Sequence, residues 1–326
     1  MLIPTDIDVR RAYLTSLSTG DGPLRPDAPH ATVNNRRWFR RIGGAPVPLS
    51  ARRRLHEQIL EQWRAANPHV ARERSAIVMA GPPGAGKSST HDQLFGGRDR
   101  RRWRELDADV FKRYLLEAAL DEGSLDELLP PELRSSSEDC GGLYPFELSA
   151  LVHRESTDFL FAAAQRDAVA DGENLIIDGT LAWKAHAERL LDHLQQSGYT
   201  IHVVDVEAPQ QVAAERIVTR WRDGFVRALS DPTDPLARLG GRWVPATAVD
   251  ALFTEFREPD HTPLRGRSVT QVNALEVSQT HTAVTRFDLY RTDDASSGAE
   301  HVERRERSAE DGELQVTWTA TPAPAE

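Results

Sequence analysis

The stretch SAIVMAGPPGAGKSST, residues 75–90, decides the fold of this chain. An apolar run ends at Gly81, and the residues that follow fit the spacing G-x-x-x-x-G-K-[ST]. The glycines let consecutive backbone N–H groups turn inward, and with the following helix N-terminus these form a cradle for phosphate. The segment therefore predicts a nucleotide-binding turn between a buried strand and a helix, made of Gly81, Pro82, Pro83, Gly84, Ala85, Gly86, Lys87, Ser88 and Ser89.

Each polar side chain of this turn has an expected task. Lys87 is expected to reach the β- and γ-phosphates, and the Ser88 hydroxyl to bind Mg²⁺. The alternative is an ordinary glycine-rich turn between a strand and a helix, but such a turn does not require a Lys-Ser pair after its last glycine. The sequence therefore predicts ATP and Mg²⁺ as cofactors.

The composition is typical of a folded globular chain. With 326 residues, 28% charged and 39% hydrophobic, it can form one large α/β domain with extensions, or two domains. No stretch reaches the roughly 18 apolar residues that a membrane helix needs. The opening MLIPTDIDVR has acids where a secretory signal has basic residues and an apolar core. We therefore expect a cytoplasmic protein with no membrane partner.

Cys140 is the only cysteine of the sequence. This count excludes an intrachain disulfide and a cysteine-based zinc site. Its surroundings, SSSEDCGGLYP, read as a loop in which nothing activates a thiol. We do not expect a catalytic cysteine.

Charge is distributed unevenly. Residues 1–104 contain 19 Lys and Arg and 9 Asp and Glu, a net charge of +10, which leaves 21 and 41, a net charge of −20, for residues 105–326. The clusters NNRRWFRR and GGRDRRRWRE could contact nucleic acid, face solvent or a partner, or help to bind an anionic substrate. Because the whole chain carries −10 and neither cluster contains a recognisable nucleic-acid motif, we favour a surface role and do not expect nucleic acid as a partner.

Apolar patterning divides the chain into three parts. Residues 1–50 are rich in Pro, Gly and Arg and predict an irregular arm. Residues 51–245 predict a P-loop core with a lid at 223–241, and residues 246–326 predict helices, a short hairpin and a disordered tail. Strand and helix patterns alternate in the core, which favours a parallel sheet with helices on both faces and ligands beyond the carboxyl ends of its strands.

The helix that leads to the first strand of the core is predicted to begin with Ser50 as its N-cap. Leu55, Ile59, Leu60 and Trp63 recur at helical spacing and are expected to form its apolar face.

Two aspartates follow the second predicted strand, in ELDADVFKRYL. At this edge of the sheet, Asp107 can bind Mg²⁺ through water, and Asp109 can accept the proton of an attacking hydroxyl. The alternative is that Asp109 caps the following helix. We favour Asp109 as the catalytic base because the P-loop already predicts phosphoryl transfer.

The third strand ends in NLIIDGTL, which places Asp178 and Thr180 at the same edge. In isolation an Asp-Gly pair is an ordinary turn. The predicted strand order puts this turn beside the P-loop strand, so we expect Asp178 and Thr180 to contact the substrate or Mg²⁺.

Arginines flank the predicted lid. Arg220 and Arg242 are expected to clamp the transferring phosphoryl group, because bidentate donors offset its growing charge. Arg216 or Arg222 could replace Arg220, since helical spacing leaves the inward face open. For each of these arginines, a solvated surface position is the alternative.

The segment LVHRESTDF begins a long helical pattern. Glu155 and His153 could face the pocket there, and a surface helix is an equal alternative. We include Glu155 as a candidate substrate ligand.

Taken together, these residues resemble the zeta-toxin family of P-loop kinases. The resemblance covers about residues 75–290 and rests on the order of GPPGAGKSS, LDADVFK, HRES, LIIDGTL, RW and GRWVP. It implies a kinase that transfers the γ-phosphate of ATP to the 3′-hydroxyl of UDP-N-acetylglucosamine, and a small helical antitoxin as a partner. Matched by motif, Lys87 and Ser88 would bind nucleotide and Mg²⁺, Asp109 would be the base, Asp178 and Thr180 would contact the sugar, and Arg220 and Arg242 would be the lid arginines.

The sequence departs from the family at three points. Asp178 stands where the best-known members have Glu, and the stretch between the two lid arginines is longer than usual. Residues 1–70 have no counterpart, which leaves room for an inhibitory arm or an antitoxin-docking surface. Two alternatives stay open: a small-molecule O-phosphotransferase of the chloramphenicol-phosphotransferase type, and an ATP-gated binding or sensor protein that needs no base.

Overall fold

The computed structural model describes residues 6–95, 100–130, 133, 142–231, 233–308 and 312–320. The chain divides into two compact units, each built from three separate segments. The helical unit consists of Met1–Ala66, Asp107–Ala164 and Ile217–Thr247, and the sheet unit consists of Asn67–Leu106, Gln165–Arg216 and Ala248–Glu326. Cys140 and the predicted disordered tail at 321–326 lie outside the described residues.

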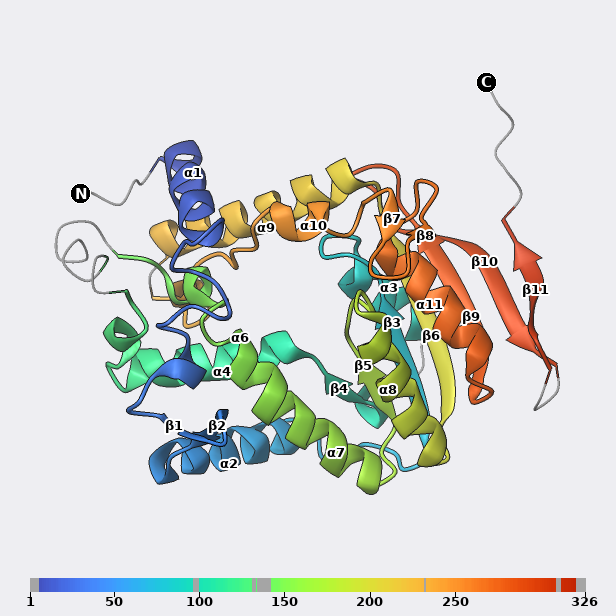
Figure 1. The fold of residues 1–326 in the computed structure, drawn as a ribbon, viewed down its shortest axis with the longest axis horizontal. Coiled ribbons are helices and arrows are strands. Elements are labelled where there is room, and N and C mark those ends of the chain that lie inside the picture. The colour runs from blue at the N-terminus through green and yellow to red at the C-terminus, as the bar shows by residue number, and fades with distance from the viewer. Residues whose placement is uncertain are drawn as a thin grey trace. The chain divides into compact units, whose positions relative to one another are not determined.

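The sheet unit is built around a seven-stranded sheet in the order β11-β10-β9-β6-β3-β5-β4 (Figure 1). The strands are β3 (Ser75–Ala80), β4 (Arg104–Leu106), β5 (Leu175–Ile177), β6 (Thr200–Glu207), β9 (Val284–Arg291), β10 (Glu300–Arg307) and β11 (Leu314–Thr319). From β4 to β9 neighbouring strands are parallel, and β10 and β11 add antiparallel pairs. The predicted parallel sheet is confirmed.

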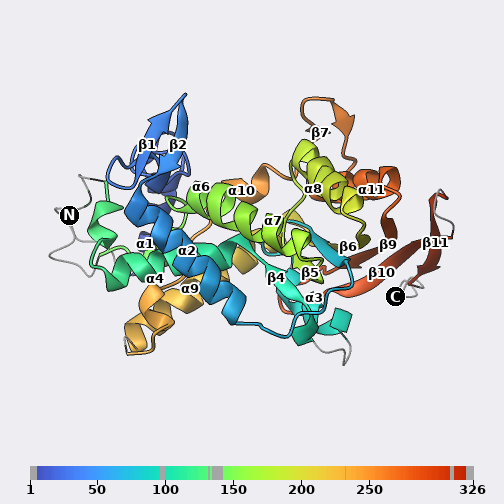
Figure 2. The ribbon, with the colours of Figure 1, turned by 90° about the horizontal axis from the view of Figure 1, so that it is seen from below.

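The central strands are mostly apolar because both faces of the sheet are covered. Val78, Ile177 and Val203, one from each of β3, β5 and β6, are at most 2% exposed. Helices α8 (Lys184–Gln196) and α11 (Val269–Thr280) lie on one face, and α3 (Lys87–Phe95) lies on the other (Figure 2). The β3-to-α3 turn therefore opens at the carboxyl edge of the sheet, where ligands bind in such folds.

The expected C-terminal hairpin is instead part of the main sheet. β9 pairs in parallel with β6, and β10 and β11 extend the sheet beyond it. The sequence EHVERRER of β10 did not predict a strand because it lacks apolar alternation. Its polar side chains are used in the fold, since His301 and Arg304 bind the fully buried carboxylate of Asp288 at 2.9 Å each.

The rest of the sheet unit connects these strands. Helix α10 (Thr247–Asp250) is a single turn, and the strands β7 (Phe256–Arg257) and β8 (Thr262–Pro263) form a two-stranded hairpin before α11. Helices α7 (Ala162–Ala170) and α9 (Gln210–Ser230) run from one unit into the other along the chain. No helix in the described part of the chain is long and apolar enough to cross a membrane.

The helical unit contains most of the remaining elements. They are α1 (Ile7–Ser18), the hairpin of β1 (Phe39–Ile42) and β2 (Ala45–Pro48), α2 (Ser50–Ala65), α4 (Ala108–Asp121), α6 (His153–Glu155) and a π-helical turn at Ser156–Phe161. Short 3₁₀ turns occur in the chain at Thr32–Asn34, Arg100–Arg102, Leu125–Glu127, Pro145–Leu148 and Ala237–Leu239.

Residues 6–50 contain a helix and a hairpin that the sequence did not predict, and turns lie between them. Asp6 caps α1 by accepting the N–H groups of Asp8 and Val9, and Leu14 is fully buried. Arg10 binds the buried carboxylate of Glu147, with Nε at 2.8 Å from Oε1. The prediction failed because the helix relies on this distant partner and on only a few apolar residues.

Helix α2 begins one residue earlier than predicted, with Leu49 in the N-cap position and no side-chain cap. Its buried face contains Ile59 and Trp63 as expected, but also Arg52 and His56. A buried acid explains this rotation of the face, as described below.

Candidate functional site

The P-loop of the sheet unit has the predicted geometry. Gly81, Gly84 and Gly86 all have positive φ angles, of 118°, 84° and 102°. A Cβ on Gly81 would lie 2.0 Å from the carbonyl oxygen of Val206, and one on Gly84 would lie 2.3 Å from that of Ala213. Only glycine fits such positions, so the backbone stays in the form that turns its N–H groups toward an anion.

Lys87 folds back over the turn. Its Nζ donates to the carbonyl oxygens of Gly81 at 2.8 Å and Pro82 at 3.2 Å. Ser88 and Ser89 are exposed in the first turn of α3. An amine held at the mouth of the cradle beside an exposed hydroxyl is the arrangement that phosphate and Mg²⁺ require.

Arg216 braces the P-loop and is not a lid arginine. Its Nη1 donates to the carbonyl oxygen of Ala85 at 3.1 Å, and its Nη2 to those of Asp294 at 2.8 Å and Ser297 at 2.5 Å. These contacts lie within the sheet unit and tie the P-loop to the β9–β10 connection. No local pattern in the sequence indicates this role, because the connection lies about 80 residues away.

Asp178 and Thr180 lie beside the P-loop, as the predicted strand order requires. β5 pairs with β3, and the N–H of Gly81 points at the carbonyl oxygen of Thr180 over 3.4 Å. Oδ1 of Asp178 is buried and has no hydrogen-bond partner among the described residues. A buried oxygen without a partner is destabilising on its own, so this atom is suited to a metal ion or a substrate hydroxyl.

Two further carboxyl groups near Lys87 were missed. Asp205 and Glu207 alternate along β6 and are 0% and 4% exposed. Burial raises the pKa of Asp205 well above its ordinary value, and Glu207 adds to this, while Lys87 opposes it. The Thr270 hydroxyl donates to Glu207 at 2.8 Å. Two acids at alternate positions of the otherwise apolar run VVDVE were the available signal.

In the helical unit, Asp109 lies between two cations. Oδ1 is 3.1 Å from Nζ of Lys112, and Oδ2 forms an ion pair with Nη1 of Arg242. Asp109 does not cap α4, because Asp107 takes that position and accepts the N–H of Asp109 at 2.8 Å. The side chain of Asp109, 28% exposed, is therefore available for chemistry at the start of the helix.

The groups around Asp109 are strongly perturbed. Burial lowers the pKa of Lys112 from 10.5 to about 8, opposed by Asp107 and reinforced by Arg220. Burial also lowers the pKa of Arg242, opposed by Asp107. His153 has its pKa lowered from 6.5 to about 4 by burial and by the Lys112 ammonium. Such clusters of shifted groups are typical of functional sites.

These contacts distinguish Arg220 from Arg222, the alternative that the sequence left open. The charge of Arg220 lowers the pKa of Lys112, so Arg220 belongs to the cluster around Asp109. Arg222 instead forms a partly exposed ion pair with its neighbour Asp223 at 3.4 Å. Lys112 itself was not predicted as a site residue, although it is one of only three lysines in the sequence. Its position one helical turn after Asp109 is the feature of the sequence from which its role at the site could have been predicted.

Glu155 has a structural role in the helical unit instead of the predicted contact with substrate. Its side chain is 0% exposed, and it accepts Nε and Nη2 of Arg52 at 2.5 and 2.8 Å and lies 2.6 Å from Nε2 of His56. Burial by itself would raise the pKa of Glu155, but Arg52 and His56 outweigh it and lower this pKa to about 2. Because Glu155 is fully buried and its oxygens are already bound, whereas Asp109 is partly exposed, we do not retain Glu155 as a substrate ligand.

The segment expected as a lid, 223–241, is packed at both ends. Helix α9 continues to Ser230, and a Cβ on Gly241 would lie 1.8 Å from the carbonyl oxygen of Trp221. Trp243, which follows Arg242, is 6% exposed and donates from Nε1 to Ser18 at 2.9 Å. Arg242 is therefore carried by a firmly packed stretch of the helical unit.

Comparison with known proteins agrees with the fold. Residues 77–233 match the family model AAA_33, described as an AAA domain. This match includes the P-loop, Asp109, Asp178 and Arg220 and ends before Arg242. No curated protein matches the chain.

Among solved structures, the fold is similar to that of the AvrRxo1-ORF1:-ORF2 complex with ATP. The TM-score is 0.54, with 14% identity, over 97% of this chain and 76% of that chain. The PezAT chromosomal toxin-antitoxin system of the human pathogen Streptococcus pneumoniae aligns with a TM-score of 0.47 and 14% identity, over 73% of this chain and 76% of that chain. The domain match and the structure with a TM-score of 0.54 confirm the predicted P-loop fold.

Proposed function

We propose that this chain is an ATP-dependent kinase that transfers the γ-phosphate to a hydroxyl of a nucleotide sugar, UDP-N-acetylglucosamine. The observation that carries the proposal is the environment of Asp109, a partly exposed carboxylate held by Lys112 and Arg242 in a chain that also has a complete P-loop. A nucleotide sensor needs the P-loop but has no use for a base between two cations.

In the proposed reaction, Asp109 accepts the proton of the acceptor hydroxyl as the new O–P bond forms. The bond between the γ-phosphorus and the bridging oxygen breaks, and ADP leaves. Arg242 and Arg220 stabilise the charge that grows on the transferring group, and Lys87 holds the β- and γ-phosphates. When phosphate oxygens compete for Arg242, they release Oδ2 of Asp109 to act as the base.

Mg²⁺ fits the residues that the sheet unit offers. The described residues contain no group of three or more His, Cys, Asp or Glu placed to hold a metal. Mg²⁺ in phosphoryl-transfer sites is usually held by one or two protein ligands together with phosphate oxygens and water. Ser88 would supply one ligand. Asp178, with its buried unpartnered oxygen, is the better second ligand, because Asp107 already uses one oxygen to cap α4. The ion would neutralise charge on the phosphates.

Thr180 is proposed to contact the sugar, and a small helical antitoxin is proposed as the protein partner. Both proposals rest on the zeta-toxin resemblance. Such an acceptor would place the protein in the cytoplasm. The ATP-bound AvrRxo1-ORF1 complex with ORF2 supports ATP as the nucleotide through the shared fold.

The test is to incubate the protein with ATP, Mg²⁺ and UDP-N-acetylglucosamine and to follow the sugar nucleotide by mass spectrometry. We expect the mass of one added phosphate, absent with Asp109→Asn. If ATP is consumed while the sugar nucleotide is unchanged, the acceptor is wrong and small-molecule hydroxyls of the chloramphenicol-phosphotransferase type are next. ATP binding without any turnover would refute the kinase and favour a sensor.

A further inference from the structure

Asn273 on α11 holds the loop that follows β5. Its Nδ2 donates to two consecutive carbonyl oxygens of that loop, those of Leu181 and Ala182, at 2.9 Å each. The Asn273 side chain is fully buried. Both hydrogens of its amide are therefore used to fix the backbone of one short segment.

Asn273 is itself held in place by Arg257. Nη1 of Arg257 donates to Oδ1 of Asn273 at 2.7 Å, which fixes the direction of the amide. Arg257 is 4% exposed and also binds Asp260 at 2.5 Å and Glu276 at 2.8 Å. Its pKa is raised above its ordinary value by these acids. Arg257 and Asn273 are thus buried at the centre of a charged network whose two acids are partly exposed, and this network orients the Asn273 amide.

The loop needs such support. Leu181 has a φ of 53°, a backbone conformation that residues other than glycine rarely adopt. The same loop carries Asp178, with its buried unpartnered oxygen, and Thr180, whose carbonyl oxygen faces the N–H of Gly81. A shift of the loop would move Asp178 relative to the P-loop.

We propose that Asn273 is a positioning residue that sets Asp178 and Thr180 against the P-loop for the proposed phosphoryl transfer. The catalytic part of this inference rests on the proposed function, whereas the structural part does not. Asn273 and Arg257 lie beyond residues 77–233, the range of the AAA-domain match. The segment from β7 to α11 therefore contributes to the proposed phosphoryl-transfer site and is not a dispensable extension.

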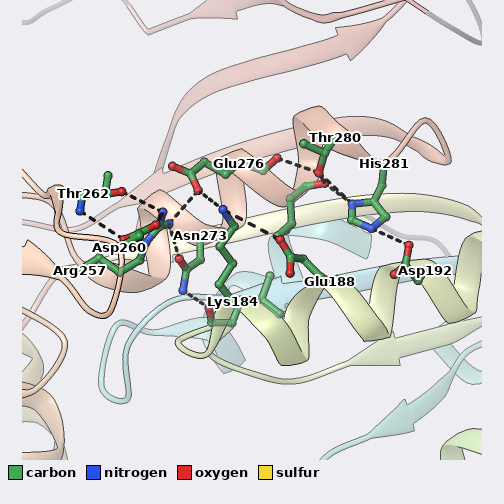
Figure 3. Close-up of polar contacts among 12 residues, drawn as sticks. Lys184, Glu188, Asp192, Arg257, Asp260, Thr262, Asn273, Glu276, Thr280 and His281 are labelled. Atoms are coloured by element: carbon green, nitrogen blue, oxygen red, sulfur yellow. Dashed lines mark hydrogen bonds and ion pairs between the residues drawn. The ribbon is translucent and has the colours of Figure 1, made fainter.

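The sharpest variant is Asn273→Asp. It keeps the shape of the side chain and the acceptor for Arg257, but it turns two donors into an oxygen that faces two carbonyl oxygens. The matched control is Asp192→Asn, which changes the 3.2 Å contact between Asp192 and His281 (Figure 3). That contact joins α8 to His281, the residue that caps the end of α11, and does not touch the loop.

Two measurements test the inference. Hydrogen exchange followed by mass spectrometry is expected to be at least about tenfold faster in the peptide covering 178–183 of Asn273→Asp, and unchanged there in Asp192→Asn. The kcat of Asn273→Asp is expected to fall about 10- to 100-fold, with the KM for ATP changed less than about threefold, because a small displacement of positioned groups affects the transition state most. If Asn273→Asp does not fold, Asn273→Ser replaces it, since it shortens the side chain away from the loop without adding a charge.

Unchanged exchange at 178–183 would overturn the inference, as would an equal loss of kcat in Asp192→Asn. If the wild-type protein transfers no phosphate to any acceptor but exchange responds as expected, the structural role stands and the proposed function fails. The two failures are therefore distinguishable.

Discussion

Replacing Glu155 by Gln is expected to destabilise the protein strongly without changing its affinity for ATP. The variant keeps the shape of the side chain but removes the charge that Arg52 and His56 bind. The Arg52 side chain is only 4% exposed, so its charge would stay buried without a counter-ion. Breaking a buried pair in this way costs about 3–5 kcal/mol.

The pKa of Glu155 gives a second measure of the same energy. It is lowered from 4.5 to about 2. That difference of about 2.5 pH units corresponds to about 3 kcal/mol at 1.36 kcal/mol per unit. Because the folded pKa is the lower one, this stability is fully present above about pH 4.5 and is lost as the pH falls toward 2.

The assay is urea unfolding of wild type and Glu155→Gln at pH 7 and pH 3. The free-energy difference between them is expected to be about 3 kcal/mol at pH 7 and clearly smaller at pH 3. Asp158→Asn is the control, since its partly exposed pair with Arg154 at 3.4 Å contributes at most about 1 kcal/mol. A difference below 1 kcal/mol at pH 7, or a selective loss of substrate affinity in Glu155→Gln, would refute the structural role.

Three further predictions follow from the site. Lys112 is expected to react with acetic anhydride with a midpoint near pH 8, and Arg220→Gln is expected to raise that midpoint because Arg220 lowers the Lys112 pKa. Peptide mass spectrometry measures the extent of the reaction at each pH. A midpoint near pH 10.5 would contradict the burial of Lys112. Arg216→Gln is expected to weaken ADP binding about tenfold, or about 1.4 kcal/mol, because the P-loop loses the hydrogen bond from Arg216. Arg222→Gln, the control, is expected to change ADP binding less than about twofold. Equal calorimetric Kd values for the two variants would contradict the role of Arg216 in supporting the P-loop. Gly81→Ala is expected to abolish ADP binding, since the new methyl group would lie 2.0 Å from a backbone oxygen of β6; retained binding in the same calorimetric assay would mean that the turn relaxes freely.

The sequence was sufficient where function depends on local geometry. The P-loop was predicted correctly because positive φ angles and the Lys-Ser pair are properties of one short segment. The position of Asp178 beside β3 was also predicted, because alternating strands and helices restrict the order of a parallel sheet.

The sequence was insufficient where a polar side chain depends on a partner far along the chain. Glu155 lies 103 residues from Arg52 and was mistaken for a substrate ligand. The charges of β10 concealed a strand because their partner, Asp288, lies on β9. Asn273 gave no signal, since the carbonyl oxygens that it binds lie 91 and 92 residues away. Periodicity predicts burial of apolar residues but does not predict which buried ions pair.

During synthesis, β3 leaves the ribosome long before either strand that pairs with it. β3 ends at Ala80, while β5 begins at Leu175 and β6 at Thr200, so 95 and 120 more residues must be added first. At about 5–20 residues per second, both edges of this apolar strand stay open for roughly 5–25 s. Open apolar strand edges associate with other chains. The yield of folded protein is therefore set in part by how well chaperones cover the nascent β3, and not only by the stability of the finished sheet.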